Sequence, residues 1–186
     1  LNGIMGMLQL LETTPLNGEQ EEYASTAMFS CTRLTRLLGD ILDLSRIEAG
    51  KIQIQDQPFD LRGLLHSLGE LFQPAARQAG ISLAVAVGDD VPAVVSGDEH
   101  RLLQVLSNLV GNAVKFTRSG EVRLEASVLP HDRDGARLYL FQVSDTGSGI
   151  DGQSLANIFE PFMQAESAGE KRRQGAGLGL SIVRGL

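Results

Sequence analysis

The spacing of hydrophobic residues changes at about residue 50 and divides the chain into two parts. Residues 1–11 carry apolar side chains at helical intervals, and residues 13–18 are rich in turn-forming residues. A longer helical pattern runs from about Glu19 to Ala49 and stops at Gly50, a residue type that often ends helices. The first part is therefore predicted to be a helical hairpin.

The apolar stripe of the longer helix is broad. Its members recur every three or four residues and are Ala24, Ala27, Cys31, Leu34, Leu38 and Ile41, widened by Leu37, Leu44 and Ile47. A stripe of this width suits a helical bundle, and one thin hairpin has no core of its own. We expect a homodimer built from two hairpins. The alternative is a hairpin that packs on its own globular domain.

After residue 50, alternating segments are mixed with helical ones. Alternation and β-branched content predict strands at 51–57, 81–87, 93–95, 121–128 and 138–144. The last of these is apolar enough to be a buried strand, and Asp134-Gly135 favours a hairpin before it. The second part is therefore predicted to be a mixed α and β domain.

Helical spacing in the second part predicts two long helices. The first runs from Asp60, which can cap it, to about Ala79, with an interruption near Pro74. The second covers about 98–116 and can be capped by Asp98. Further along, Asp151 can cap a short helix, residues 163–174 have the composition of a loop, and residues 175–180 open an apolar helix.

Composition narrows the function classes. The 186 residues are 42% hydrophobic and 21% charged, which is typical of a globular protein. The net charge of -7 disfavours a general nucleic-acid or anionic-membrane surface. The single Cys31, for which packing is the expected role, excludes an internal disulfide and a cysteine-based zinc site. The sequence starts and stops inside apolar patterns, so we expect a piece of a longer chain.

The first candidate for chemistry is a polar face on the helix at 98–116. Asn108, Asn112 and Lys115 are spaced four and three residues apart, so they share one face. Two carboxamides and an ammonium group can hold a hydrated divalent cation and phosphate oxygens, because Mg²⁺ prefers oxygen ligands and keeps several waters. A solvated polar face would have the same pattern.

The second candidate follows the strand at 138–144. Asp145 stands at the strand end, and Gly147 and Gly149 make a turn that lets a ligand approach the backbone. The carboxylate can accept a hydrogen bond from an exocyclic amine such as that of adenine. The pattern also occurs in ordinary turns. Downstream, Gly175, Gly177 and Gly179 enter a helix, where backbone N–H groups can meet phosphate or where the glycines simply pack tightly.

Four segments in this order resemble the motifs of the catalytic domain of sensor histidine kinases, within the ATPase superfamily shared with gyrase and MutL. Their counterparts are the N box at 108–117, the first glycine box at 145–150, the F box at 159–162 and the second glycine box at 175–180. Residues 1–4 and 38–50 resemble parts of the family's dimerisation hairpin. The resemblance covers essentially the whole chain.

The resemblance implies an α+β fold. Residues 1–50 would form the dimerisation hairpin, as half of a dimeric four-helix bundle, and residues 51–186 an ATP-binding α/β sandwich of the gyrase, histidine-kinase and MutL type without its last strands. ATP and Mg²⁺ would be the cofactors. The family transfers the γ-phosphoryl group of ATP to a histidine on the hairpin and then to an aspartate of a receiver domain.

The resemblance also implies roles for individual residues. Asn112 would be the main Mg²⁺ ligand, assisted by Asn108, while Lys115 would approach the phosphates. The adenine amine would donate to Asp145. The glycines that would shape the adenine pocket or line the phosphate side are Gly147, Gly149, Gly175, Gly177 and Gly179.

The chain departs from the family at several points. The family's phosphoacceptor histidine lies just upstream of the Leu1 position, so no catalytic acceptor is assigned and we expect no autophosphorylation by this chain. His66, His100 and His131 do not match that motif, and structural or solvent roles are expected for them. Gln174 and Ala176 replace a glycine and a small hydroxyl residue that are common in the family.

The expected setting is the cytoplasmic portion of a membrane-anchored bacterial sensor kinase, with membrane contact only through other parts of the parent chain and with no nucleic-acid partner. Two other functions compete. One is a dimeric interaction module with a vestigial nucleotide site, which the presence of Asn112 and Asp145 disfavours. The other is a gyrase-type ATP hydrolase, which would want a carboxylate base where this chain has Asn108.

Overall fold

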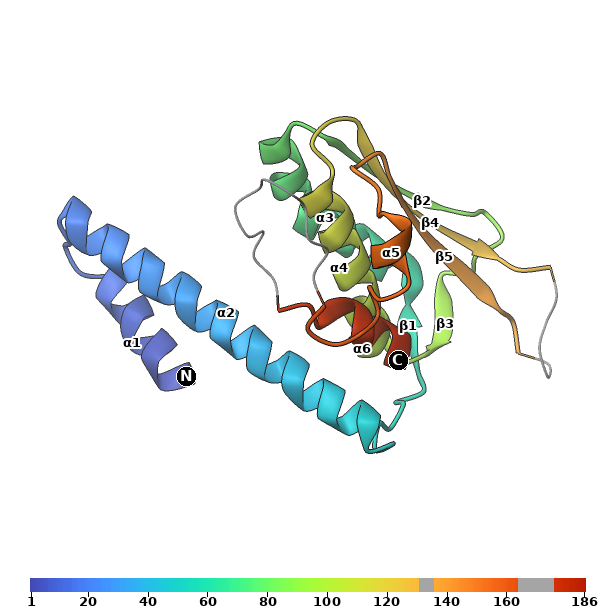
Figure 1. Cartoon of the computed structure of the whole chain (residues 1–186), viewed down its shortest axis with the longest axis horizontal. Coiled ribbons are helices and arrows are strands. Elements are labelled where there is room, and N and C mark those ends of the chain that lie inside the picture. The colour runs from blue at the N-terminus through green and yellow to red at the C-terminus, as the bar shows by residue number, and fades with distance from the viewer. Residues whose placement is uncertain (131–135, 164–175) are drawn as a thin grey trace.

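A helical hairpin projects from a mixed α/β body (Figure 1) in the computed structural model, which describes residues 1–130, 136–163 and 176–186. The hairpin consists of α1 (Asn2–Glu12) and α2 (Gly18–Glu48). A local capping box starts α2: Asn17 accepts a hydrogen bond from the Gln20 amide, and the Gln20 side chain accepts one from the Asn17 amide. The predicted hairpin is confirmed.

Among its described residues, the body contains two small sheets. Strands β2 (Ser82–Val87), β4 (Glu121–Val128) and β5 (Tyr139–Asp145) form one sheet in the order β2-β4-β5, in which β2 is parallel and β5 antiparallel to β4. Strands β1 (Gln57–Asp60) and β3 (Val94–Gly97) form an antiparallel pair. The antiparallel β4 and β5 agree with the predicted hairpin, although Asp134 and Gly135 lie outside the described residues.

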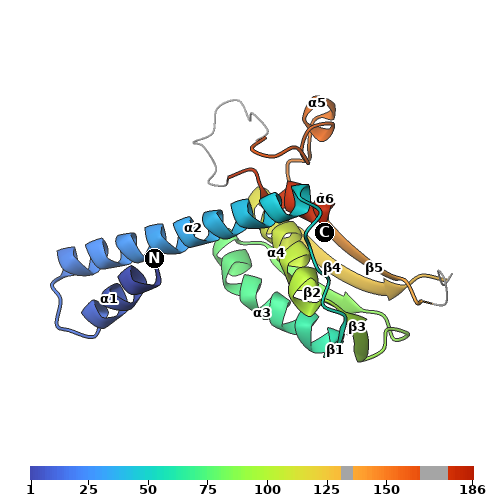
Figure 2. The ribbon, with the colours of Figure 1, turned by 90° about the horizontal axis from the view of Figure 1, so that it is seen from below.

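Two long helices cover one face of the three-stranded sheet (Figure 2), namely α3 (Leu61–Ala79) and α4 (Glu99–Phe116). Asp60 caps α3 through the Gly63 amide and Asp98 caps α4 through the Arg101 amide, as predicted. The core lies between these helices and the sheet, and its fully buried members include Leu65, Leu68, Leu106, Val122 and Leu124. Two short helices, α5 (Gly152–Leu155) and α6 (Gly179–Gly185), follow β5.

Three predictions about elements are corrected. Residues 51–56 are not a strand, and β1 begins only at Gln57, where β3 offers a partner. Helix α3 is not interrupted at Pro74, which lies within it on an exposed position. The carbonyl that this proline leaves without a donor belongs to Glu70, and that residue is exposed, so water can satisfy it.

The third correction concerns β5, which is not buried. Its side chains alternate between half-buried and exposed positions, because one face packs on the core and the other meets solvent. The half-buried residues that pack against the core are Tyr139, Phe141 and Val143.

The hairpin contacts the body through α2. Ile47 lies so close to Gly185 of α6 that a β-carbon on the glycine would come within 2.6 Å of Ile47 Cγ2. The alternative of a hairpin packed on its own globular domain is therefore realised for the last turns of α2. Leu34, Leu38 and Ile41 keep 46–47% exposure, so their apolar faces remain available to a second copy.

Candidate functional site

The polar face of α4 is present, but its members differ in burial. Asn108 is only 8% exposed, whereas Asn112 and Lys115 are half-buried. The Lys115 ammonium lies 4.7 Å from the centre of the Phe116 ring. The amide oxygen of Asn108 faces two elements: it lies 3.0 Å from where a β-carbon would stand on Gly179, and Arg36 Nη2 of α2 donates to it across 3.4 Å.

The Asp145 turn is fastened to the C-terminal end of α4. Asp145 is exposed rather than buried, and its Oδ1 accepts a hydrogen bond from the Gly147 amide at 2.8 Å. A β-carbon on Gly147 would stand 2.7 Å from the carbonyl oxygen of Phe116, so only glycine allows this approach. Thr146 secures the turn, because its Oγ1 accepts from the Glu121 amide at 3.0 Å.

Two glycine turns therefore contact one helix at separated points. Gly179 meets α4 at Asn108, and Gly147 meets it at Phe116, eight residues later. Eight residues of α-helix span about 12 Å, at 1.5 Å per residue. The half-buried Asn112 and Lys115 lie between these two contacts along the helix.

The segment at 159–162 packs against the second glycine turn. The Phe162 amide donates to the Gly177 carbonyl at 3.0 Å, and both residues have left-handed backbone conformations, with φ of 65° and 73°. A β-carbon on Gly177 would stand 2.7 Å from the Met163 carbonyl oxygen. Met163 and Gly177, which flank residues 164–175, are thus held together. Gly175 and the expected loop at 163–174, apart from Met163, lie outside the described residues.

The side chains of this site limit how a divalent cation could bind. Among the described residues, no group of three or more histidine, cysteine, aspartate or glutamate side chains is placed to hold a metal. The amide oxygens of Asn108 and Asn112 are neutral, so a bound Mg²⁺ would draw its remaining ligands from water and phosphate oxygens. The residues present fit a magnesium–phosphate complex better than a free ion.

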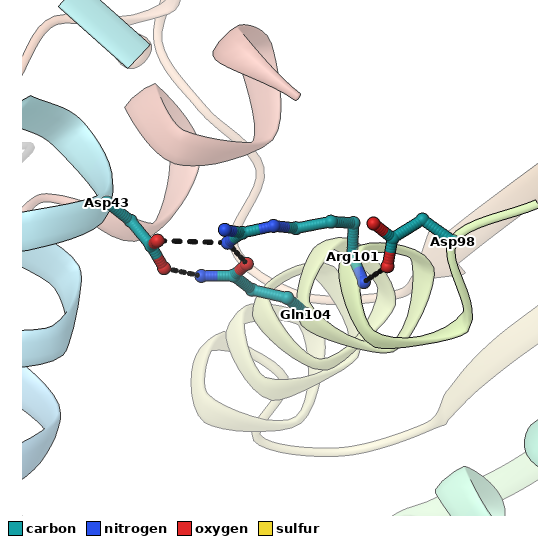
Figure 3. A network of polar contacts seen from close by, with 4 residues as sticks. All are labelled: Asp43, Asp98, Arg101 and Gln104. Carbon is teal, nitrogen blue, oxygen red and sulfur yellow. Dashed lines mark hydrogen bonds and ion pairs between the residues drawn. The ribbon is translucent and has the colours of Figure 1, made fainter. Parts of the chain in front are cut away.

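A polar network on the first turns of α4 was not foreseen from the sequence (Figure 3). Asp43 of α2 accepts hydrogen bonds from Arg101 Nη1 at 2.9 Å and from Gln104 Nε2 at 2.7 Å. Burial is the largest single influence on Asp43 and works against its ionisation, but the hydrogen bonds from Gln104 and Arg101 together with the charges of Arg101 and Arg46 outweigh it and hold its pKa below the ordinary value. Arg101 and Gln104 lie three residues apart on one face of α4, yet nothing local identifies Asp43 as the partner of both.

Asp98 supports the same turn of α4. Its Oδ2 accepts from the Gln55 amide and its Oδ1 from the Arg101 amide, each at 2.9 Å. These backbone hydrogen bonds, from Gln55 first and Arg101 second, lower the pKa of Asp98. The cap predicted from sequence therefore also anchors the segment that links α2 to β1.

Neither of the two histidines that the structure describes is a hydrogen-bond partner of Asn108, Asp145 or Asp43. His66 is exposed on α3, where its Nε2 lies 3.6 Å from Glu70, and His100 is exposed in the first turn of α4. His131 lies outside the described residues.

Comparison with known proteins identifies two family models in the chain. The His Kinase A (phospho-acceptor) domain matches residues 1–50, and the histidine kinase-, DNA gyrase B- and HSP90-like ATPase matches residues 97–186. The autoinducer 2 sensor kinase/phosphatase LuxQ of Vibrio cholerae is 42% identical over all 186 residues, and so is the sensory/regulatory protein RpfC of Xanthomonas campestris pv. campestris. The chain spans only 22% and 26% of the lengths of these two relatives.

Solved structures agree in fold. Full-length ShkA, crystallised in complex with AMPPNP, superposes with a TM-score of 0.79 at 42% identity over 99% of this chain and 37% of its own. The histidine kinase AdeS of Acinetobacter baumannii superposes with a TM-score of 0.66 over 99% of this chain and 81% of its own, and at 20% identity it supports the fold alone. Among the described residues, no helix is both long and apolar enough to cross a membrane.

Both parts of the resemblance drawn from the sequence are thereby confirmed, the helical phosphoacceptor part and the ATPase part. The chain belongs to the histidine kinase family.

Proposed function

We propose that this chain is the core of an ATP-dependent sensor kinase of a two-component system, with a dimerisation hairpin at 1–50 and an ATP-binding catalytic domain at 51–186. The observation that carries the nucleotide site is the placement of two glycine turns against one polar helix, Gly147 at Phe116 and Gly179 at Asn108. This arrangement supports a ligand with a base at one end and phosphates at the other.

The proposed roles follow that layout. The exposed Asp145 carboxylate accepts from the adenine amine beside the Gly147 and Gly149 turn, and the Gly175, Gly177 and Gly179 turn lines the phosphates. Asn112 holds Mg²⁺ with assistance from Asn108, and Lys115 approaches the phosphate oxygens. Magnesium supplies charge neutralisation when it is bound.

The reaction proposed for the parent chain is transfer of the γ-phosphoryl group to the imidazole of a histidine and then to a receiver-domain aspartate. The bond from the γ-phosphorus to its bridging oxygen breaks, a phosphorus–nitrogen bond forms, and ADP leaves. The protein's contribution is to position the two reactants and to place positive charge and N–H donors around the phosphates. A neutral Asn108 in place of a carboxylate base favours transfer to a protein acceptor over hydrolysis.

Calorimetric titration with a non-hydrolysable ATP analogue, with and without Mg²⁺, tests this function. The wild-type chain should bind, and binding should weaken without Mg²⁺. Asp145→Asn replaces one acceptor oxygen by a donor that faces the adenine amine, so affinity should fall about 10- to 100-fold, as expected for the loss of a charged hydrogen-bond partner.

Arg123→Ala is the matched control, because Arg123 is an exposed residue of β4 whose ion-pair partner among the described residues is the half-buried Glu125, at 3.6 Å. It should bind as the wild type does. Absence of binding by a folded wild-type chain would favour the interaction module with a vestigial site.

A further inference from the structure

The hairpin places one arginine beside the phosphate end of the candidate nucleotide site. Arg36 of α2 donates from Nη2 to the amide oxygen of Asn108 on α4, 72 positions further along the chain. The same oxygen lies 3.0 Å from where a β-carbon would stand on Gly179, the first residue of α6. The arginine and the second glycine turn therefore meet around one oxygen, where α2 runs beside α4 and α6 (Figure 2).

A second contact fixes α2 at this point. Asp43 lies seven residues after Arg36 and accepts a hydrogen bond from Arg101, which lies seven residues before Asn108 on α4 (Figure 3). The two helices are therefore antiparallel here, and seven residues are nearly two helical turns, so each pair lies on one face of its helix. The Asp43 and Arg101 side chains are only 17% and 16% exposed. A sheltered, charge-assisted contact keeps its geometry better than an exposed ion pair does, so Arg36 is held at this place.

The hydrogen bond to Asn108 uses little of what Arg36 can donate. At 3.4 Å it is long for an N–H···O hydrogen bond, and its acceptor is a neutral amide. A guanidinium carries five N–H donors in a planar fork. Arg36 is exposed, and among the described residues no carboxylate forms an ion pair with it. Most of its donors and its full charge are therefore available to a ligand.

The layout of α4 indicates which part of a nucleotide Arg36 can reach. The proposed site places adenine at Gly147, which contacts α4 at Phe116. The phosphates extend toward Gly179, which contacts α4 at Asn108. These two contacts are eight residues apart, or about 12 Å along the helix. Arg36 lies at the end that is farther from the base, where the last phosphate of the nucleotide would lie.

A phosphate is a better partner for Arg36 than the Asn108 amide is. Charge-assisted hydrogen bonds are roughly twice as strong as neutral ones, and a guanidinium can bind one phosphate with two parallel N–H···O bonds. The exchange of one long hydrogen bond for such a pair also releases the Asn108 oxygen, which then can accept from the water shell of Mg²⁺. A magnesium triphosphate would therefore satisfy both side chains at once.

We propose that Arg36 is a phosphate-binding residue that the hairpin adds to the nucleotide site of the body. It holds the terminal phosphate and so distinguishes a nucleoside triphosphate from a diphosphate. This inference rests on the proposed function and deepens it, because it makes the nucleotide site a joint product of the two parts of the chain.

Calorimetric titration with Mg²⁺ tests this role by comparing the non-hydrolysable ATP analogue with ADP. Arg36→Ala should weaken binding of the analogue about 10- to 100-fold, the range expected for the loss of charged hydrogen bonds, and should change the affinity for ADP by less than about two-fold. Arg36→Lys keeps the charge but not the planar fork, so its affinity for the analogue should lie between those of the wild type and Arg36→Ala.

Arg33→Ala is the matched control, because it removes the same charge from an exposed position three residues earlier on α2. Its affinity for both nucleotides should stay at the wild-type value, since a distant charge is largely screened by salt. Unchanged binding of ADP by Arg36→Ala would show that this variant is folded and that its adenine pocket is intact.

The outcomes separate this role from the proposed function. If neither the wild type nor any variant binds a nucleotide, the proposed function fails. If the wild type binds and Arg36→Ala binds the analogue equally well or more tightly, the nucleotide site stands and the role of Arg36 is wrong. Equal weakening for ADP and the analogue would also overturn it, because Arg36 would then not read the terminal phosphate. The same loss in Arg33→Ala would show a general effect of charge and would overturn it too.

Discussion

At the scale of single residues, Gly147 lets the turn after β5 contact the end of α4. A β-carbon there would stand 2.7 Å from the Phe116 carbonyl and 2.8 Å from Asp145 Oδ1. We predict that Gly147→Ala lowers the free energy of unfolding by about 1–3 kcal/mol, because the turn must move off the helix end. Gly152→Ala, where no atom lies within 4 Å of the new carbon, should change it by less than about 0.5 kcal/mol.

Urea unfolding of both variants checks this prediction. The same displacement should carry Asp145 away from its place, so the Gly147 variant should also lose affinity for the ATP analogue. Equal stabilities for the two variants would show that the Phe116 contact yields without cost.

At the scale of elements, the N-terminal caps of α3 and α4 differ in the number of backbone amides that they satisfy. Asp60 satisfies one amide of α3, whereas Asp98 satisfies one amide of α4 and the Gln55 amide of the linking segment. Asp60→Ala should cost about 1 kcal/mol of unfolding free energy, the usual value for one cap, and Asp98→Ala should cost more, up to about 2 kcal/mol. Chemical unfolding would contradict this reasoning if the two variants were equally destabilised.

The exposed apolar stripe of α2 carries a second prediction at this scale. Leu38 is 46% exposed on the face that we expect a second hairpin to cover. Leu38→Asp would bury a carboxylate in that bundle, so it should convert a dimer to a monomer, as measured by light scattering. Leu71→Asp is the control on α3, where the side chain is 65% exposed and outside the hairpin, and the dimer should persist.

At the scale of the whole molecule, the junction between hairpin and body depends on two ionised carboxylates. The pKa of Asp43 and of Asp98 is lowered in the folded protein, mainly by the hydrogen bonds described above. Arg101 and Arg46 also favour the charged form of Asp43, whereas burial raises the pKa of the neighbouring Asp40. A lowered pKa stabilises the native state above the ordinary carboxyl pKa, and this stability is lost as the pH falls through the lower native value.

We therefore predict that docking of α2 persists at neutral pH and weakens only below about pH 4, the ordinary carboxyl range. Carboxyl-carbon NMR titration should show Asp43 titrating below an unfolded reference. The unfolding free energy of the wild type should fall more steeply below pH 4 than that of Asp43→Asn. Parallel curves would mean that the ionised Asp43 carboxylate contributes nothing to the junction.

The sequence alone was sufficient for most elements and for the order of the candidate motifs. Helices α2, α3 and α4 and strand β4 follow from apolar spacing, and the starts of α3 and α4 also follow from the caps Asp60 and Asp98, because these signals act within a few residues. The sequence failed where a distant partner decides the outcome: residues 51–56 lack a strand to pair with, Pro74 is accommodated at an exposed position, and β5 lies half in solvent.

Only the tertiary structure decided which residues meet across the two parts of the chain. Asp43 and Arg101 are 58 positions apart, and Arg36 and Asn108 are 72 apart. All four occupy ordinary polar positions of amphipathic helices, where local periodicity distinguishes a buried face from an exposed one but does not select a partner. That choice depends on the linking segment, on the packing of Ile47 against Gly185 and on the register of two antiparallel helices, which emerge only when the whole chain has folded.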